Sequence, residues 1–291
     1  MPELTPGAVV TLAPRLRRIL APNPGIFTGP GTNTYLLGED ELAVIDPGPD
    51  DPVHIEAVAA AGAGRIRWIL VTHTHPDHAP GAAGLAKLTG AEVLGFDARD
   101  DFSPDTEIGD GWALRTPELH LSAVHTPGHA SNHLCYLLEI ERILLSGDHI
   151  MNGSTVIISP PDGDMAAYMQ ALARLELIKP PIKTILPGHG DVIDDPKAKV
   201  EEYITHRRAR EEAVFQYVEG AGKATLDDIV AVVYAGVGTE YHPLARFSVW
   251  AHLRKMADEG RVHSGDPDDM SANWHPTRQR SRARRGRRRQ A

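Results

Sequence analysis

The sequence predicts a layered α/β domain followed by a small winged-helix-like C-terminal domain. Short apolar runs alternate with helical segments up to residue 196, metal-binding side chains follow several of those runs, and three helical segments occupy the rest. A hydrophobic fraction of 42% and a charged fraction of 24% are those of a globular protein with a substantial core. The chain therefore divides into an α/β domain at 1–196, a winged-helix-like domain at 197–270 and a basic, disordered tail at 271–291.

The α/β domain is expected to begin with a β meander over residues 24–48. Apolar runs at 34–37 and 42–45 predict two of its strands, and the polar residues 38–40 form the turn between them. An alanine-rich helix is expected next, at 53–61.

The alternation of strand and helix continues around a histidine-rich loop. We expect a strand at 66–71 before the loop, then a short helix at 81–88 whose small residues let its backbone lie close to the loop. A strand at 91–94 follows. The acidic stretch 97–117 is expected to be a loop region with a hairpin around residues 109–111.

The second half of the domain is expected to contain four strands and one helix. The strands are expected at residues 119–124, 134–138, 143–145 and 183–186, and the second and third of these should pair. The helix is expected at 165–178, where apolar residues recur at helical spacing. Asp162 and Asp164 precede this helix and can cap its N-terminus.

Residues 72–78 place four metal-binding side chains directly after an apolar run. These side chains are His73, His75, Asp77 and His78. Imidazole nitrogens and carboxylate oxygens are the ligands that Zn²⁺ takes in open catalytic sites. The alternative is chance clustering in a chain with 15 histidines, but the pattern H-x-H-x-D-H rarely arises by accident.

The same arrangement recurs at three later strand ends, each time directly after a glycine. The residues are His129, Asp148 and His189, preceded by Gly128, Gly147 and Gly188. Glycine permits a tight turn and a close approach of the backbone. A packed core does not require a polar residue at the end of each strand, so the repetition indicates that these residues share one site.

Together the seven side chains can fill two neighbouring metal sites. The expected groups are His73, His75 and His129 for one metal and Asp77, His78 and His189 for the other. Asp148 is suited to bridge them, because a carboxylate can span two metals roughly 3.5–4 Å apart. Water between two divalent ions loses a proton near neutral pH. We therefore expect hydrolysis by a metal-bridging hydroxide, with Asp77 and Asp148 as catalytic residues and two zinc ions as cofactors; manganese and iron are alternatives.

Several other polar residues have two possible interpretations. Asp46 either orients a ligating histidine or is an ordinary turn residue. Thr32, Asn33 and Thr34 either line the substrate cleft or form a turn. The remaining histidines close to and away from the motifs are expected to be structural: His54, His120, His125, His133 and His149. Substrate contacts are not assigned.

The distribution of charge argues against binding to duplex DNA. Residues from Arg278 onward contain eight arginines and no acid, so removing them from the net charge of −9 leaves −17 on residues 1–277. Residues 200–275 carry eight Lys or Arg against thirteen Asp or Glu. A winged helix that reads duplex DNA is basic, so we expect this domain to serve packing or the substrate pocket. The basic tail is either a solvated extension or, less often, a nucleic-acid arm.

The single cysteine, Cys135, excludes a disulfide framework within the chain, so any metal must be held by histidine and carboxylate. The first 24 residues contain five prolines and lack the apolar segment of a signal peptide. No run approaches the roughly 20 apolar residues of a membrane span. We expect a cytoplasmic protein without membrane contacts.

The ordered set of motifs resembles the metallo-β-lactamase superfamily. The resemblance covers residues 20–195 and rests on H-x-H-x-D-H followed by Gly128-His129, Gly147-Asp148 and Gly188-His189. It implies a four-layer αβ/βα sandwich with a dimetal site at one edge, and it implies the ligand roles given above. True β-lactamases of the superfamily have a cysteine or no bridging acid where this chain has Asp148. β-Lactam hydrolysis is therefore expected to be at most promiscuous.

A narrower resemblance is to the β-lactamase-like protein 2 group. It rests on residues 23–28, residues 31–35, the sequence Thr-Pro-Gly-His at 126–129 and the helical C-terminal domain. The resemblance implies a metal-dependent endoribonuclease that acts on single-stranded RNA. The alternatives are a small-molecule thioester or lactone hydrolase similar to glyoxalase II, and a non-catalytic, metal-stabilised RNA-binding module. The expected partner is thus a small ester or thioester or a single-stranded RNA.

Overall fold

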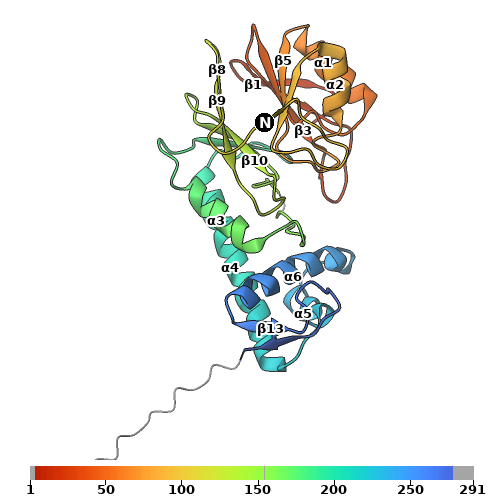
Figure 1. Cartoon of the computed structure of the whole chain (residues 1–291), viewed down its shortest axis with the longest axis vertical. Coiled ribbons are helices and arrows are strands. Elements are labelled where there is room, and N and C mark those ends of the chain that lie inside the picture. Colours follow the sequence, from red (N-terminus) through yellow and green to blue (C-terminus); the bar gives the residue numbers. More distant parts are fainter. Residues whose placement is uncertain (1–3, 154, 278–291) are drawn as a thin grey trace, which may run out of the picture. The chain divides into compact units, whose positions relative to one another are not determined.

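The computed structural model describes residues 4–153 and 155–277 (Figure 1). The chain forms two compact units, which divide between Arg208 and Ala209. The division lies within the long helix α4 (Pro196–Ala221). The first unit contains both large sheets, and the second contains three shorter helical segments and a two-stranded sheet.

The first sheet has seven strands in sequence order. They are β1 (Val9–Ala13), β2 (Leu16–Leu20), β3 (Asn33–Leu37), β4 (Leu42–Ile45), β5 (Ile66–Leu70), β6 (Glu92–Gly95) and β7 (Thr106–Glu107). Neighbours from β1 to β4 are antiparallel, and neighbours from β4 to β7 are parallel. The sequence did not predict β1 and β2. Prolines interrupt this region, and the buried side chain of Arg18 breaks the apolar pattern of β2.

The second sheet has five strands in the order β12-β11-β10-β9-β8. Their bounds are β8 (Ala113–Arg115), β9 (His120–His125), β10 (Leu134–Leu138), β11 (Ile143–Gly147) and β12 (Thr184–Pro187). The predicted pairing of the segments at 134–138 and 143–145 is confirmed. The predicted hairpin around residues 109–111 is wrong, because β7 pairs with β6 in the first sheet whereas β8 pairs with β9 in the second. This turn carries the chain from one sheet to the other.

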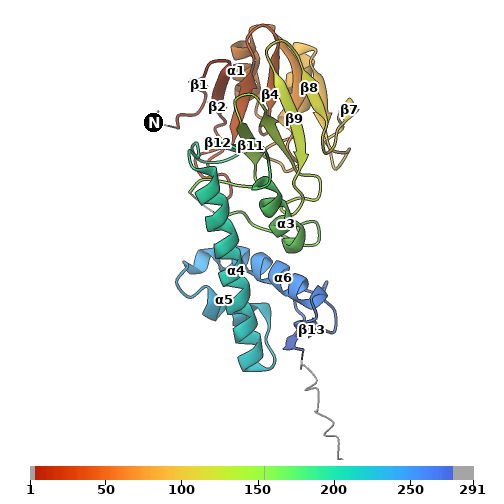
Figure 2. The same cartoon turned by 90° about the vertical axis from the view of Figure 1, so that its left-hand side faces the viewer.

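Two apolar cores define the layers of the first unit (Figures 1 and 2). One core lies between the sheets, and Tyr35, Leu70, Tyr136 and Leu186 belong to it. The other lies between the outer face of the first sheet and the helices α1 (Pro52–Gly62) and α2 (Gly81–Thr89). Helix α3 (Met165–Leu175) and the start of α4 lie beside the second sheet. The four-layer sandwich is therefore confirmed.

Local sequence signals account for the helix ends. Asp51 accepts a hydrogen bond from the backbone N–H of Val53 at 2.8 Å and caps α1. Asp164 accepts one from Ala167 N–H at 2.8 Å, as expected for the cap of α3. A Cβ on Gly81 would lie 2.7 Å from Pro47 O, so the small residue at the start of α2 does allow a close approach to the neighbouring turn.

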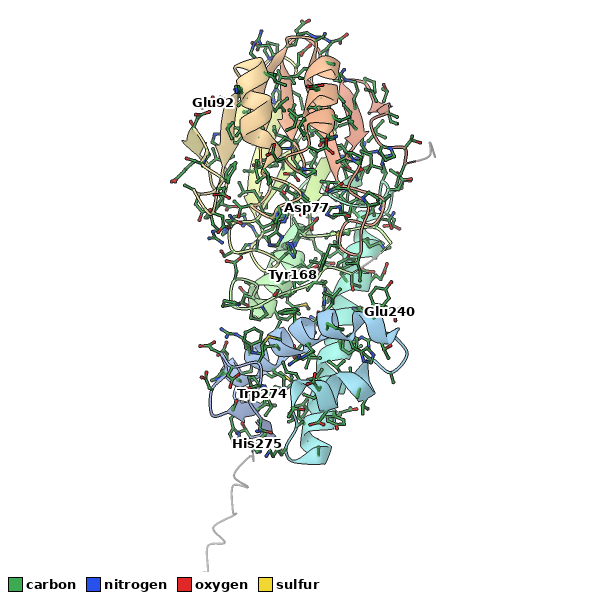
Figure 3. The ribbon with its side chains drawn as sticks, turned by 90° about the vertical axis from the view of Figure 1, so that its right-hand side faces the viewer. Asp77, Glu92, Tyr168, Glu240, Trp274 and His275 are labelled. Carbon is green, nitrogen blue, oxygen red and sulfur yellow. The ribbon has the colours of Figure 1, made fainter. Side chains whose placement is uncertain are left out.

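Strand direction brings the polar strand ends to one edge of the sandwich. Strands β4 and β5 are parallel, as are β11 and β12, and β9 points the same way as β11 because each is antiparallel to β10. Figure 3 shows Asp77 at this edge, whereas Glu92, the first residue of β6, lies at the opposite edge. Side chains that are far apart in sequence thus meet where the strands end.

The residues Thr32, Asn33 and Thr34 do not line a cleft, because all three side chains are fully buried. Asn33 Nδ2 donates to Pro187 O at 2.9 Å and to Gly190 O at 2.8 Å. Tyr35 Oη also donates to Pro187 O, at 2.8 Å. Strand β3 therefore holds the loop that carries His189. The cleft interpretation of these residues is wrong, and Asn33 and Thr34 lie in a strand rather than in a turn.

The second unit has a helical, winged-helix-like fold. It contains the end of α4, α5 (Leu226–Val233), the short 3₁₀ helix η1 (Thr239–Tyr241), α6 (His242–Asp258) and the paired strands β13 (Val262–Ser264) and β14 (Trp274–Pro276). Trp274 is completely buried in this unit (Figure 3). Strand β14 lies within the segment 271–291, so the assignment of that segment to a disordered tail is wrong for residues 274–276. Residues 278–291 lie outside the described residues.

Within the described ranges 4–153 and 155–277, no helix combines the length and the apolar character that a membrane crossing requires.

The substitution Asn33→Ala is expected to lower the free energy of unfolding of the first unit by about 2 kcal/mol, because two buried carbonyl groups lose their donor. Chemical unfolding followed by tryptophan fluorescence measures this change. Asn152→Ala is the control, since the Asn152 amide makes a single, longer hydrogen bond of 3.3 Å to Val192 O. Equal losses for the two variants would contradict the role given to Asn33.

Candidate metal centre

The seven residues singled out in the sequence converge at one edge of the first unit. The loop after β5 carries His73, His75, Asp77 and His78, and the ends of β9, β11 and β12 are followed by His129, Asp148 and His189. Among the described residues they form three overlapping groups in which the ligand atoms lie within 4.8 Å of one another: His73, His75 and His129; His73, His78 and Asp148; and Asp77, His78 and His189. The expected grouping into two neighbouring sites is consistent with this geometry.

The first group consists of three imidazoles. His75 Nδ1 lies 2.9 Å from His73 Nε2 and 3.0 Å from His129 Nε2. Ligand nitrogens around a tetrahedral zinc ion lie about 3.3 Å apart, given Zn–N bonds of about 2.05 Å. The spacing of these nitrogens is therefore close to that of a tetrahedral metal site.

The second group combines two imidazoles with a carboxylate. Nε2 of His78 and Nε2 of His189 are 3.3 Å apart, and Asp77 Oδ2 lies 3.5 Å and 3.1 Å from them, respectively. Asp148 stands between the two groups. Its Oδ1 is 3.2 Å from His189 Nε2, and its Oδ2 is 3.6 Å from His129 Nε2. Each oxygen of Asp148 thus faces a different group, which is the arrangement that a bridging carboxylate needs.

The outer nitrogen of four histidines is bound to an oxygen, which fixes the tautomer. His73 Nδ1 donates to Thr72 Oγ1, His78 Nδ1 to Asp46 Oδ2, His129 Nδ1 to Ile157 O and His189 Nδ1 to Gly31 O. With the proton on Nδ1, the lone pair on Nε2 is directed at the cluster. The rings are therefore oriented as metal-ligating histidines are.

Asp46 connects two of these histidines. It is buried at the end of β4, and it accepts hydrogen bonds from Thr72 N–H at 2.7 Å, from Thr72 Oγ1–H at 2.8 Å and from His78 Nδ1–H at 2.8 Å. Thr72 Oγ1 is in turn the acceptor for His73. Of the two interpretations of Asp46, the orienting role is the one that the geometry supports.

The glycines before the ligands are required by close packing. Gly128 and Gly147 have φ angles of 138° and 47°, in the region that L residues rarely adopt. A Cβ on Gly188 would lie 2.8 Å from both Asp148 Oδ1 and His78 Cε1. The glycine pattern in the sequence therefore reflects strained turns at two positions and direct contact with ligand side chains at the third.

The electrostatics of the cluster divide the histidines into two kinds. Burial and neighbouring imidazoles hold the pKa of His73 well below its ordinary value and lower that of His75 to about 4, and burial lowers the pKa of His129. For His189, burial opposes protonation, but the Asp148 and Asp77 carboxylates prevail and raise its pKa to about 9. The pKa of His78 is likewise raised, by Asp77, Asp148 and Asp46 against the effect of burial.

The donor set fits divalent metal ions. Asp148 Oδ1 is buried between two imidazoles, 3.2 Å from His189 Nε2 and 3.4 Å from His78 Nε2. Burial would raise the pKa of Asp148, but the positive charge on His189 and His78 holds it well below the ordinary value. A buried carboxylate needs a compensating cation, and the imidazole nitrogens that converge on Asp148 can bind one. The residues present are those that hold zinc and related metals.

His133 is a structural neighbour of the cluster, as expected from the sequence. It is fully buried, and its Nε2 accepts the backbone N–H of Asp148 at 3.1 Å. Because that nitrogen accepts, the proton is on Nδ1, which lies 2.9 Å from Thr126 Oγ1. His133 therefore fixes the backbone that carries the bridging carboxylate. Its position four residues after His129 gave no signal of this contact.

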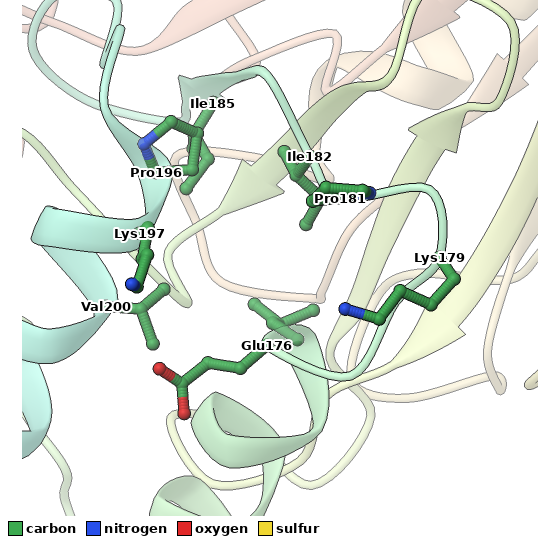
Figure 4. A pocket seen from close by; sticks show the side chains of 9 residues that line it. Glu176, Lys179, Pro181, Ile182, Ile185, Pro196, Lys197 and Val200 are labelled. Carbon is green, nitrogen blue, oxygen red and sulfur yellow. The ribbon is translucent and has the colours of Figure 1, made fainter.

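Two cavities in the first unit differ in their relation to the cluster. One, of about 440 Å³, is lined by His75 together with parts of α2 and the loop 99–103. The other, of about 330 Å³, lies between the end of α3, β12 and the start of α4 (Figure 4). Figure 4 shows Glu176, Lys179 and Lys197 around its apolar wall. None of the seven residues lines the second cavity, so it is separate from the metal centre.

Comparisons with known proteins agree with this geometry. The sequence profile of the metallo-beta-lactamase superfamily matches residues 27–189, and that of the beta-lactamase associated winged helix domain matches residues 225–274. The chain is 34% identical to a protein named beta-lactamase-like protein 2 homolog from Drosophila melanogaster, over 93% of this chain and 97% of that protein. It is 32% identical to a protein named atrochrysone carboxyl ACP thioesterase from Aspergillus chevalieri, over 79% of this chain and 76% of that protein.

A solved structure shares the fold over nearly the whole chain. It is described as a beta-lactamase domain protein from Burkholderia ambifaria, and it matches with a TM-score of 0.79 and 19% identity over 94% of this chain and 95% of that one. At this identity the likeness shows the fold alone.

Fold and site together define a metal-dependent hydrolase with a His/Asp metal-binding cluster. With the matches of the family profile and the full-length relative, the chain belongs to the metallo-β-lactamase superfamily.

Asp46→Asn is expected to weaken zinc binding by roughly 10- to 100-fold. The amide would place an N–H group opposite the Thr72 and His78 donors, whose hydrogen bonds the Asp46 carboxylate accepts. Competition with a chromophoric chelator measures the affinity. Asp105→Asn is the matched control, since Asp105 Oδ2 accepts the backbone N–H of Val93 away from the cluster. Unchanged affinity in Asp46→Asn would exclude the orienting role.

Gly188→Ala is expected to lower zinc affinity about tenfold while the protein stays folded, because the new methyl group meets two ligand side chains. Gly109→Ala serves as the control, since a Cβ at Gly109 meets nothing within 4 Å. Metal analysis after dialysis, with circular dichroism as the check on folding, gives the comparison. Full zinc content in Gly188→Ala would contradict the packing argument.

Proposed function

We propose that the protein hydrolyses an ester or thioester bond in a small acyl substrate, with two zinc ions held by the seven-residue cluster. The observation that carries the proposal is the chemistry of the surface around the cluster. The cavity beside His75 combines apolar side chains with Asp50, Asp100 and Asp101. Its single arginine, Arg99, is bound to Asp97 and Asp162. Such a surface accommodates a small acyl group better than a polyanion.

The loop at residues 25–31 supports an apolar substrate. Ile26 and Phe27 are 54% and 59% exposed on a turn closed by hydrogen bonds between Gly25 and Gly29. The end of this loop is joined to the cluster, because Gly31 O accepts the hydrogen bond from His189 Nδ1. Exposed apolar side chains on a loop that is joined to the cluster provide a contact surface for an apolar group of the substrate.

The residues of the cluster have distinct roles in the proposed reaction. The metal ions, when bound, polarise the acyl carbonyl and lower the pKa of water. Asp148 is buried and holds the two halves of the cluster together. Asp77 is more exposed, with 23% of its side-chain surface accessible, and its carboxylate can hold the attacking water. The water oxygen joins the acyl carbon, the bond to sulfur or oxygen breaks, and the proton passes to the leaving group.

The relatives support this proposal in part. A relative named as an acyl-carrier-protein thioesterase is 32% identical to this chain over a region that covers 79% of this chain and 76% of the relative. That name describes the relative, and its substrate class is carried over here as a proposal. We further propose a cytoplasmic location, because the one cysteine is a buried free thiol whose pKa is raised by burial to about 12, which requires no oxidising compartment.

The second candidate function is cleavage of single-stranded RNA, as the resemblance to the β-lactamase-like protein 2 group implies. The full-length match to a relative with that name favours it. The acidic residues near the cluster disfavour it, because a phosphodiester backbone would be repelled except where metal ions neutralise it. The basic segment 278–291 is the part of the sequence best suited to contact RNA.

Zinc-loaded protein is expected to hydrolyse acyl-pantetheine thioesters or S-lactoylglutathione, and Asp77→Ala is expected to reduce kcat/KM at least about 100-fold. Release of free thiol, followed with a chromogenic reagent, measures the rate. The same preparations are incubated with a labelled, unstructured RNA. RNA cleavage that is lost in Asp77→Ala, with no thiol release from either substrate, would replace the thioesterase proposal with the nuclease.

A truncated chain that ends at residue 277 separates catalysis from RNA recruitment. Thioester hydrolysis is expected to be unchanged, because all seven residues of the cluster lie between positions 73 and 189 and remain in the truncated chain. Electrophoretic mobility of the RNA measures association. Loss of RNA association in the truncated chain, together with a zinc-loaded wild-type protein that hydrolyses neither substrate, would favour the non-catalytic RNA-binding module.

A further inference from the structure

The cavity beside His75 is a candidate substrate pocket next to the metal ligands. It has a volume of about 440 Å³ and lies between the ligand loop, the start of α2 and the loop after β6. Its apolar wall contains Ala79, Ala82, Ala83, Val93 and Phe102. A cavity of this size and lining can hold a small organic group.

The orientation of His75 places the cavity one side chain away from the cluster. Nδ1 of His75 faces His73 and His129, at 2.9 Å and 3.0 Å. The opposite edge of the ring, with Nε2, is therefore directed away from the ligand atoms. Because the ring also lines the cavity, a group bound there is separated from the metal ligands by the His75 ring.

The outer wall of the cavity is a tight turn with a fixed position. Arg99 and Phe102 exchange two backbone hydrogen bonds, both of 3.0 Å, so Asp100 and Asp101 lie at the tip of the turn. Arg99 anchors this turn to Asp162 at 2.8 Å, and the Phe102 ring packs so closely on Gly95 that a Cβ there would lie 2.6 Å from it. The two aspartates are therefore held at the cavity by a rigid support.

The charge of the cavity is negative. Asp50, Asp100 and Asp101 line it and are exposed. Arg99 is the only cationic residue in the lining described, and its guanidinium group is already shared between Asp97 and Asp162. A carboxylate or phosphate entering the cavity would meet three like charges, whereas an ammonium group would be attracted.

We propose that this cavity is a specificity pocket that binds an uncharged or cationic apolar group of the substrate and excludes anionic groups. The assignment rests on the proposed function in one respect, namely that the bound group belongs to the molecule that is hydrolysed. It narrows the substrate class to esters or thioesters in which the group bound beyond the His75 ring carries no negative charge.

Binding of small probes tests the pocket without any turnover. Pentylammonium, pentanol and pentanesulfonate have the same chain and differ in charge, and saturation-transfer NMR with the zinc-loaded protein gives their dissociation constants. Pentylammonium is expected to bind about five-fold more tightly than pentanol, as one close charge pair in a water-rich site provides. Pentanesulfonate is expected to bind more weakly than pentanol.

Two variants and one control locate the binding. Ala83→Leu fills the cavity from an exposed position of α2. It is therefore expected to weaken the binding of pentanol and pentylammonium at least about ten-fold while the fold stays intact. The double variant Asp100→Asn, Asp101→Asn is expected to bring the ratio of pentylammonium to pentanol affinity close to one. The control Glu92→Gln, Glu107→Gln makes the same change of charge on β6 and β7, outside the cavity lining, and should leave the ratio unchanged.

The outcomes separate this proposal from the proposed function. Three results would each overturn the pocket. The probes could bind Ala83→Leu as they bind the wild type, the ratio of pentylammonium to pentanol affinity could fall equally in the control, or pentanesulfonate could bind as tightly as pentylammonium. Absence of thioester turnover, with the expected binding pattern preserved, would instead overturn the proposed function alone. With an active enzyme, butyryl thioesters should be hydrolysed faster than succinyl thioesters, and the double Asn variant should reduce that preference.

Discussion

The rest of the structure depends on the electrostatic requirement of one buried carboxylate. Asp148 is almost fully buried among imidazoles, and its Oδ1 lies 3.2 Å from His189 Nε2 and 3.4 Å from His78 Nε2. A buried charge of this kind is tolerated only when cations face it. The protein meets this requirement by bringing five histidines to strand ends around Asp148, and the pKa values of two of them, His78 and His189, are raised by the Asp148 and Asp77 carboxylates. His133 then holds the backbone of Asp148. Asp46 holds the ring of His78 by a direct hydrogen bond and the ring of His73 through Thr72.

The sequence predicted the cluster because each ligand follows the end of a strand, and apolar runs and glycines mark those strand ends in the sequence. Features that depend on tertiary contacts could not be predicted in this way. Strand β2 carries a buried Arg18 whose partner, Asp191, is more than 170 positions away. The turn at 109–111 has the composition of a hairpin, yet it passes between sheets. Buried Asn33 and His133 support loops through hydrogen bonds that no local pattern encodes.

The end of the chain illustrates the same limit. The sequence from residue 271 is polar and precedes a run of arginines, so composition alone assigns it to a tail. Trp274 nevertheless fills the core of the second unit, and β14 pairs with β13. One large apolar side chain is enough to order a short strand when a partner edge is available, and composition averaged over a window conceals it.

Substrate choice, by contrast, is determined around the cluster rather than in it. The same ligand set can serve several hydrolyses, and the function lies in what surrounds it. The most direct test of the central claim, that seven residues hold two metal ions, is anomalous X-ray diffraction at the zinc edge from crystals of the zinc-loaded protein. Two peaks are predicted, one among His73, His75 and His129 and one among Asp77, His78 and His189, both adjoining Asp148. A single peak, or peaks away from these residues, would contradict the account.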